Sequence, residues 1–195
     1  MKLGKVYRRA ALPSTKLPTM KASLLFLLLV PALASADTLK VDKEKSRIQV
    51  DAKATGHSFT GTLGDYQATV KGDVSDLKPT AMKLTWKFTD LKTGDEKRDA
   101  EMIKWLGGGA PEGSFEFTKT WEDKGQHFAQ GKLTIKGVSK SIGFPYSAKK
   151  EGAWITIDGT AGMNYEDFGL PVIRKLVMTV QSGLSVRFHL VGKLE

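Results

Sequence analysis

The chain has 195 residues, with 30 Lys and Arg against 21 Asp and Glu, a formal net charge of +9 and no cysteine. The lack of cysteine excludes disulfides, thiolate metal sites and a lipoprotein anchor. Because residues 1–36 hold six of the basic residues and none of the acidic ones, residues 37–195 carry 24 against 21, a net charge of +3. We therefore expect no nucleic-acid partner.

The N-terminal residues 1–36 have the features of a cleaved export signal. An uncharged run, ASLLFLLLVPA, occupies residues 22–32 and is too short to span a bilayer. The small-x-small pattern of Ala34–Ala36 follows it, and we expect cleavage after the last of these residues. Met20 opens a compact signal of its own and is an alternative start of translation. The expected product is one domain, residues 37–195, exported to the periplasm.

Strand patterns dominate the rest of the chain. In Met82–Thr89, Met, Leu, Trp and Phe alternate with Lys and Thr without a break. This period of two is typical of an antiparallel strand with one face on a core. Turn signals separate the runs of this kind. We expect strands near 38–43, 46–55, 66–74, 81–89, 114–122, 126–136, 139–149, 153–162 and 177–194, the last bent at Gly183.

One charged segment interrupts the strands. Thr93–Leu106 reads TGDEKRDAEMIKWL and is rich in helix formers. It predicts a short helix that begins after Asp95, which caps it, and that ends at the GGGAP of Gly107–Pro111. A second irregular stretch covers Asn164–Arg174.

Many strands and one short helix favour a sandwich or a closed barrel. A barrel of about eight strands is either filled by its own side chains or holds one small ligand. Small residues at inner positions hint at space inside: Ala52, Ala54, Gly131 and Ala161. The pattern alone leaves both alternatives open.

Several stretches resemble the YceI-like family of exported polyisoprenoid-binding proteins, across essentially all of residues 37–195. The most specific match is the family's TG…RD helix opening, here Thr93-Gly94 and Arg98-Asp99. The other matching segments are Val41–Val50, Pro111–Phe117, Gly131–Val138 (the family's G-x-L-T-I-x-G-V strand) and Tyr165–Gly169. Three features depart from the family pattern: Lys45 for a histidine, Tyr165 for an arginine, and Gly107–Gly109 for a Phe-containing helix end.

The resemblance implies an all-β fold, a lipocalin-like barrel of eight antiparallel strands with a short helix after the fourth or fifth strand. It also implies that a polyprenyl chain, such as a quinone tail or polyprenyl phosphate, lies in a hydrophobic channel; no other cofactor is expected. Each buried methylene of such a chain gains about 0.8 kcal/mol. The residues expected to line the channel are Phe59, Met82, Leu84, Trp86, Phe88, Met102, Phe115, Phe117, Leu133, Ile135, Phe144, Phe168, Val186 and Phe188.

Three polar residues are candidates for contact with the ligand's head group at the channel mouth. They are His57, which the resemblance identifies as a family histidine in a Gly-flanked loop, Arg98 and Arg174. The structural alternatives are a histidine bonded to nearby backbone and an Arg98-Asp99 pair that pins the helix. His127, in an expected hairpin turn, and His189, on the outer parity of its strand, are expected to face solvent.

No catalytic residue and no metal ligand is predicted, because no nucleophile accompanies His57 and the histidines lack metal-site spacing. Three hypotheses remain open. The protein carries or shields an isoprenoid lipid, or it is an enzyme acting on such a lipid with His57 and Arg98, or it is a filled barrel with a structural or stress role. As partners we expect an isoprenoid lipid, transient contact with a membrane, and either a monomer or a homodimer.

Overall fold

The computed structural model describes residues 37–175 and 177–195, and the expected signal peptide lies outside them. The helical elements are the 3₁₀ turn η1 (Phe88–Asp90), the α-helix α1 (Glu96–Trp105) and the 3₁₀ turn η2 (Tyr165–Phe168). The strands are β1 (Asp37–Val41), β2 (Arg47–Ala54), β3 (His57–Leu63), β4 (Gln67–Asp73), β5 (Lys78–Lys87), β6 (Leu91–Lys92), β7 (Glu112–Asp123), β8 (Gln126–Ile135), β9 (Val138–Glu151), β10 (Trp154–Asn164), β11 (Arg174–Lys175), β12 (Met178–Thr179) and β13 (Gly183–Leu194).

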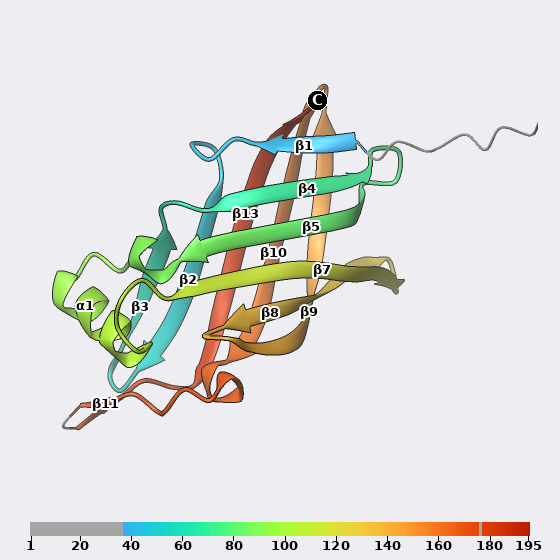
Figure 1. Cartoon of the computed structure of the whole chain (residues 1–195). Coiled ribbons are helices and arrows are strands. Elements are labelled where there is room, and N and C mark those ends of the chain that lie inside the picture. The colour runs from blue at the N-terminus through green and yellow to red at the C-terminus, as the bar shows by residue number, and fades with distance from the viewer. Residues whose placement is uncertain (1–36, 176) are drawn as a thin grey trace, which may run out of the picture. The chain divides into compact units, whose positions relative to one another are not determined.

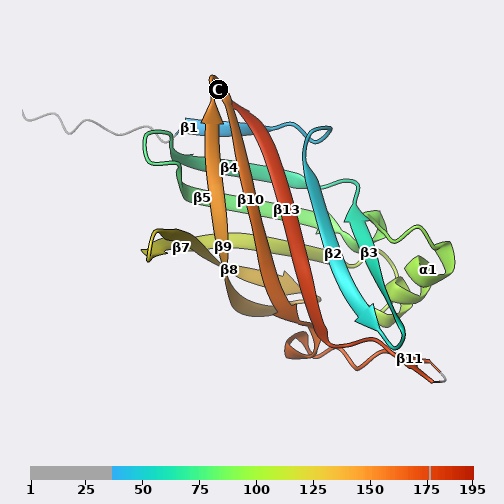
Figure 2. The same cartoon turned by 180° about the vertical axis from the view of Figure 1, so that it is seen from behind.

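The strands close into the expected eight-stranded antiparallel barrel. Neighbours in the order β1-β4-β5-β7-β8-β9-β10-β13 are hydrogen-bonded, and β1 pairs again with β13. This closing pair sets Leu39 opposite Leu194. Figures 1 and 2 show two walls whose strands cross, one with β1, β4, β5 and β7 and the other with β9, β10, β13 and β2. Alternate side chains of each strand therefore face a common interior.

Two of the barrel strands are interrupted. β1 and β2 both pair with β13, and residues 42–46 form the break between them. Ser46 replaces the missing ladder there: its Oγ accepts from the Val191 N–H at 2.9 Å and donates to the Val191 carbonyl at 3.2 Å. In the same way, β3 pairs with β2 and β4 with β1, so the second barrel strand bends between Leu63 and Gln67.

Ser46→Ala tests this replacement of the ladder. Ser46 is only 9% exposed, and the change leaves the N–H of Val191 without its side-chain partner. We expect the free energy of unfolding, measured by urea denaturation, to fall by about 1–3 kcal/mol. Ser147→Ala, on the exposed face of β9, is the matched control and is expected to change it by less than about 0.5 kcal/mol. Equal stability of the two variants would contradict the role of Ser46.

The expectation that His57 lies in a loop is wrong, because His57 is the first residue of β3. The inward residues of this strand are Phe59, Gly61 and Leu63. Gly61 interrupts the apolar alternation, so the pattern does not reveal the strand. His127, expected in a turn, is likewise a strand residue, the second of β8.

The expected final strand over residues 177–194 is divided. Met178 and Thr179 form β12, and β13 begins only at Gly183. Between them the pairing changes, since β12 pairs with β11 and not with a barrel strand, and Val180 makes only an isolated bridge with Ala54. The bend expected at Gly183 is thus a break.

Helix α1 begins and ends where the sequence predicts. Asp95 caps it by accepting from the Arg98 N–H at 3.0 Å. The buried carboxylate of Asp99 accepts from the N–H of Thr93 at 3.0 Å and from its hydroxyl at 2.6 Å. At the other end, three consecutive glycines, Gly107–Gly109, take positive φ angles of 103°, 79° and 69°, which unwind the helix. The TG…RD motif therefore fixes the helix to the strand before it.

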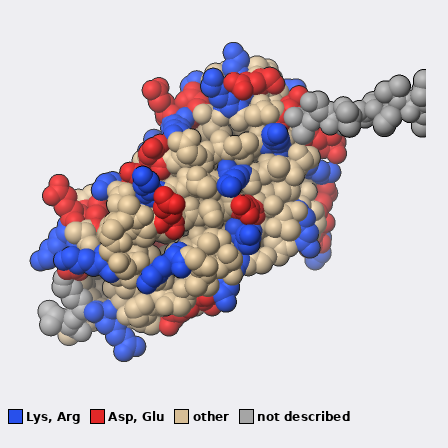
Figure 3. Space-filling model, in the orientation of Figure 1, with Lys and Arg blue, Asp and Glu red and all other residues tan. Residues whose placement is uncertain are grey.

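Charged side chains of both signs are scattered over the face of the barrel that carries β4, β5 and β7 (Figure 3), in keeping with the nearly balanced charge of residues 37–195. Within the described residues, no helix has the length and apolar content needed to cross a bilayer.

Candidate functional site

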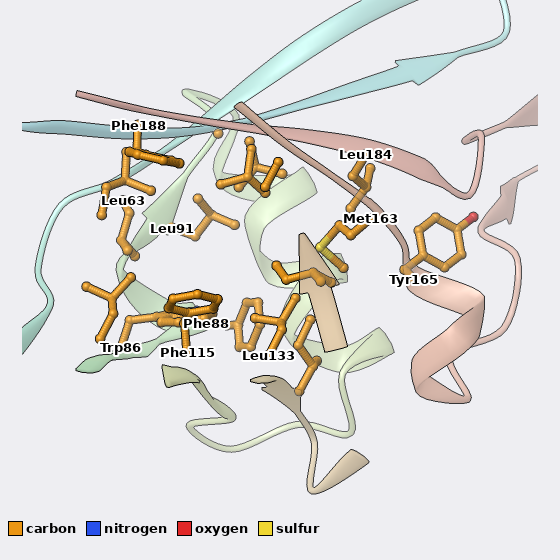
Figure 4. Close-up of a pocket in the computed structure, with 18 of the residues that line it drawn as sticks. Leu63, Trp86, Phe88, Leu91, Phe115, Leu133, Met163, Tyr165, Leu184 and Phe188 are labelled. Atoms are coloured by element: carbon orange, nitrogen blue, oxygen red, sulfur yellow. The ribbon is translucent and has the colours of Figure 1, made fainter. Parts of the chain in front are cut away.

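The barrel encloses an apolar cavity of about 310 Å³ (Figure 4). All the predicted channel residues border it except Phe168, which is buried in η2 beside it and is not part of its wall. The wall also contains residues that the prediction left out, mostly from β2, β3, β6, β10 and the loop before β13. Strand parity would have identified those that lie in expected strands, among them Ile48, Val50, Tyr146 and Leu184, whereas Leu63, Leu91, Met163 and Tyr165 lie outside the expected strands.

Inward-facing glycines let aromatic rings lie along the barrel wall. An added Cβ at such a glycine would come within 2.2–2.3 Å of a ring atom, so each glycine provides the space its ring occupies. The three pairs are Gly113 with Trp86, Gly131 with Phe115, and Gly159 with Phe188. Because these rings lie over glycines rather than over larger side chains, the axis of the barrel stays open.

The small residues expected to leave space inside the barrel differ in their roles. Gly131 provides room for the ring of Phe115 and not directly for a ligand. Ala52 and Ala161 do border the cavity, whereas Ala54 does not and instead forms a bridge with Val180.

The two ends of the cavity differ. At the far end a second apolar cluster of Leu39, Val70 and Ile155 closes the barrel. At the near end lies α1, and there the wall contains its charged side chains, Arg98 and Glu101, beside Thr93. An amphiphilic molecule in the cavity would therefore place its polar group near α1 and its apolar part along the barrel axis.

Arg98 is held in position at this polar end. Its guanidinium lies 4.4 Å from the centre of the Phe59 ring and 3.4 Å from the Asp95 carboxylate. The backbone N–H of Arg98 is the main cause that holds the pKa of Asp95 below its usual value, so the cap stays ionised at neutral pH. With a side chain 32% exposed, Arg98 remains accessible to a ligand at the mouth.

The other two head-group candidates do not border the cavity. His57 is exposed, and its ring centre lies 6.2 Å from that of Phe59. Arg174 is exposed in β11. His189 faces outward, as expected, and its Nδ1 lies 2.7 Å from a carboxylate oxygen of Asp158.

Two tyrosines bring hydroxyl groups into the wall. Tyr165 is 1% exposed, donates to the Val180 carbonyl at 2.9 Å, and accepts from the Ile173 N–H at 3.4 Å. The hydroxyl of Tyr146 is also buried and has no hydrogen-bond partner among the described residues; burial raises its pKa. Tyr146 is thus a polar group inside the barrel that could bond to a ligand or a water molecule.

The ring of Tyr165 also connects the helix to the loop before β13. It packs edge-on against Trp105 with ring centres 5.1 Å apart, and the indole N–H of Trp105 donates to the Pro171 carbonyl at 2.9 Å. In the part of the chain that the structure describes, no three acidic or histidine side chains are grouped to hold a metal ion. Among the described residues, the site therefore offers an apolar wall, the cation of Arg98 and the carboxylate of Glu101 at the mouth, and few hydroxyls.

Comparison with known proteins gives a sequence match and a fold match. Residues 39–192 match the model of a family described as the YceI-like domain. The crystal structure of Burkholderia cenocepacia BcnA is 22% identical, covering 79% of this chain and 100% of that chain with a TM-score of 0.69. The YCEI protein of Campylobacter jejuni is 18% identical, covering 69% and 84%, with a TM-score of 0.57. The comparison with curated proteins found no match.

Proposed function

The chain belongs to the YceI-like domain family, and from this premise we propose that its barrel binds the apolar chain of an isoprenoid lipid, with the polar head near Arg98. The observation that carries the proposal is the apolar cavity of about 310 Å³, whose charged side chains are gathered at one end. A quinone tail and a polyprenyl phosphate both have this division into an apolar chain and a polar head.

The energetics of the cavity support a ligand. At about 24 cal/mol per Å³, an apolar cavity of 310 Å³ with nothing packed in it costs on the order of 7 kcal/mol. Whole domains are stable by only about 5–15 kcal/mol. An apolar chain inside the barrel recovers this packing, at about 0.8 kcal/mol per buried methylene.

The volume also bears on how much of a lipid is enclosed. Ligand pockets usually measure about 300–1,000 Å³, and 310 Å³ is at the small end of that range. We infer that the barrel encloses only the few isoprene units that follow the head group.

The test is direct recovery of the ligand. The purified protein is extracted with organic solvent, the extract is analysed by mass spectrometry, and the protein is then titrated with farnesol, a neutral isoprenoid alcohol, while its melting temperature is followed. We expect saturable binding and a melting temperature that rises with ligand concentration. An extract without isoprenoid, together with no saturable binding, would reject the proposal.

Arg98→Ala is expected to separate the two ligand classes. A charge-assisted hydrogen bond is worth about 1.5–3 kcal/mol when buried, and less at this partly exposed site, so affinity for farnesyl phosphate should fall about tenfold. Affinity for neutral farnesol should not change. Lys97→Ala, an exposed neighbour on α1, is the control. Loss of affinity for both ligands alike would show that Arg98 supports the wall and does not contact the head.

Binding rather than catalysis is the activity that we propose. Among the described residues that border the cavity, the ionisable groups are Arg98, Glu101 and two tyrosines, and neither histidine nor serine is present. A hydrolytic or group-transfer reaction would need a nucleophile and a base in contact with the reacting atom.

Export is the remaining part of the proposal. If residues 1–36 are a signal peptide, protein recovered from the periplasm will begin at Asp37. Intact-mass spectrometry of the periplasmic and cytoplasmic fractions measures this. A periplasmic protein that retains residues 1–36, or its absence from that fraction, would contradict the assignment.

A further inference from the structure

Two neighbouring apolar side chains are exposed at the hairpin formed by β11 and β12. Val177 is 89% exposed and Met178 43%. The exposed indole of Trp154, by comparison, lies under the ammonium of Lys45, 3.8 Å from the ring centre. The hairpin thus presents adjacent apolar side chains, with Val177 almost wholly in solvent. Single exposed apolar residues are common on protein surfaces, whereas adjacent ones at the end of a projecting hairpin indicate a site of interaction.

The hairpin is fastened to the barrel beside the turn between β2 and β3. The N–H of Thr55 donates to the Thr179 carbonyl at 3.0 Å, and the N–H of Gln181 donates to the Lys53 carbonyl at 2.8 Å. Figures 1 and 2 both show β11 at the end of the barrel opposite the C-terminus, next to this turn. The exposed pair therefore has a defined place on the molecule.

The base of the hairpin belongs to the cavity wall. Ile173 and Val180 border the cavity, and the N–H of Val180 donates to the Ile173 carbonyl at 3.0 Å. The hairpin that carries Val177 and Met178 at its end thus has its base in the cavity wall.

The surroundings of the pair are basic. Exposed Lys53 and Arg174 lie in the two segments that meet here. Residues 52–64 and 168–194 contain no Asp or Glu. An apolar tip with cations beside it suits a surface that is apolar just beneath negatively charged groups, such as the surface of a bilayer that contains anionic lipid.

We propose that Lys53, Arg174, Val177 and Met178 form a docking tip that inserts into the surface of an anionic lipid bilayer. Val177 and Met178 enter the boundary between head groups and acyl chains, and Lys53 and Arg174 contact lipid phosphates. Docking sets the apolar base of the hairpin against the membrane that supplies the ligand. This purpose rests on the proposed function, whereas attachment to the bilayer needs no ligand in the cavity.

The test is sedimentation with phosphatidylcholine vesicles, with and without phosphatidylglycerol and free of isoprenoid. We expect the wild type to bind the anionic vesicles and to bind the neutral ones only weakly. Binding to the anionic vesicles should decrease at high salt, because the cations of the tip are exposed. Val177→Asp should lower partitioning about tenfold, because it replaces an inserted aliphatic group by a charge. Val138→Asp changes an exposed valine elsewhere and should bind like the wild type. All variants are recovered from the periplasm, and intact mass confirms that each begins at Asp37, so that the basic and apolar residues 1–36 add no binding of their own.

Three results would overturn the docking tip: no binding of the wild type to anionic vesicles, equal binding of Val177→Asp and wild type, or equal loss in Val138→Asp. Light scattering adds a fourth, a dimer that Val177→Asp dissociates, which would assign the tip to a second copy of the chain. Farnesol binding by Val177→Asp in detergent is measured in parallel. If it is normal while docking fails, the cavity proposal stands and only the docking proposal is lost.

Discussion

Ala161→Phe is expected to lower the affinity of the barrel for farnesol about a thousandfold while the protein remains folded. Ala161 lies on β10, borders the cavity and is 4% exposed, so a phenyl ring there points into the space that the ligand needs. If the ring displaces one isoprene unit of about five carbons, about 4 kcal/mol of burial is lost at about 0.8 kcal/mol per carbon. That loss corresponds to about three powers of ten in the dissociation constant. Isothermal titration measures it.

The stability of the same variant separates blocking from misfolding. Because the ring fills a cavity, the melting temperature should stay the same or rise. Thr160→Phe, one residue earlier and exposed on the outside of β10, should bind farnesol normally. Ala52→Phe, from β2, repeats the blocking test from another strand. Unchanged farnesol binding in both folded cavity variants would place the ligand elsewhere.

Tyr165→Ala is expected to reduce the free energy of unfolding by about 3–5 kcal/mol, the range for removal of a large buried aromatic side chain. The ring is 1% exposed and packs on Trp105, and its hydroxyl bonds to the backbone of Val180 and Ile173. The substitution thus leaves a void between α1 and the loop before β13. Urea denaturation followed by circular dichroism measures the change.

Tyr165→Phe is the matched variant, since it keeps the ring and removes the hydroxyl. It leaves the carbonyl of Val180 without its donor, for an expected loss of about 1–3 kcal/mol. The difference between the two variants then reports the packing of the ring on Trp105. A loss below about 1 kcal/mol in Tyr165→Ala would show that the loop does not depend on this contact for its position.

The α-helix illustrates what local chemistry predicts well. Asp95 caps α1 and Gly107–Gly109 end it, because a side-chain oxygen that accepts from a helix N–H and a glycine at positive φ act within a few residues. The burial of Asp99 against Thr93 is a different case. The sequence shows the pair as a family motif, but only the structure shows which groups bond.

The residues that border the cavity were predictable where they alternate along a regular strand, and they were not predictable elsewhere. Alternation places Met82, Leu84 and Trp86 on one face, and all three border the cavity. His57 and Arg174 were assigned to the mouth from residue type and motif, and they lie away from the cavity wall. The type of a residue does not tell whether its side chain faces the cavity, because that depends on which strands meet at the end of the barrel.

The sequence by itself determined the antiparallel strands, the capped helix, the near balance of charge in residues 37–195 and the family. These follow from periodicity and from contacts between residues close in the chain. Only the tertiary structure decided the pairing of β3 and the closure of β1 on β13. It also decided the volume of the cavity, because Gly113, Gly131 and Gly159 leave space at the wall for aromatic rings from neighbouring strands. Each of these depends on residues far apart in the chain, whose meeting is set by register and packing and not by local pattern.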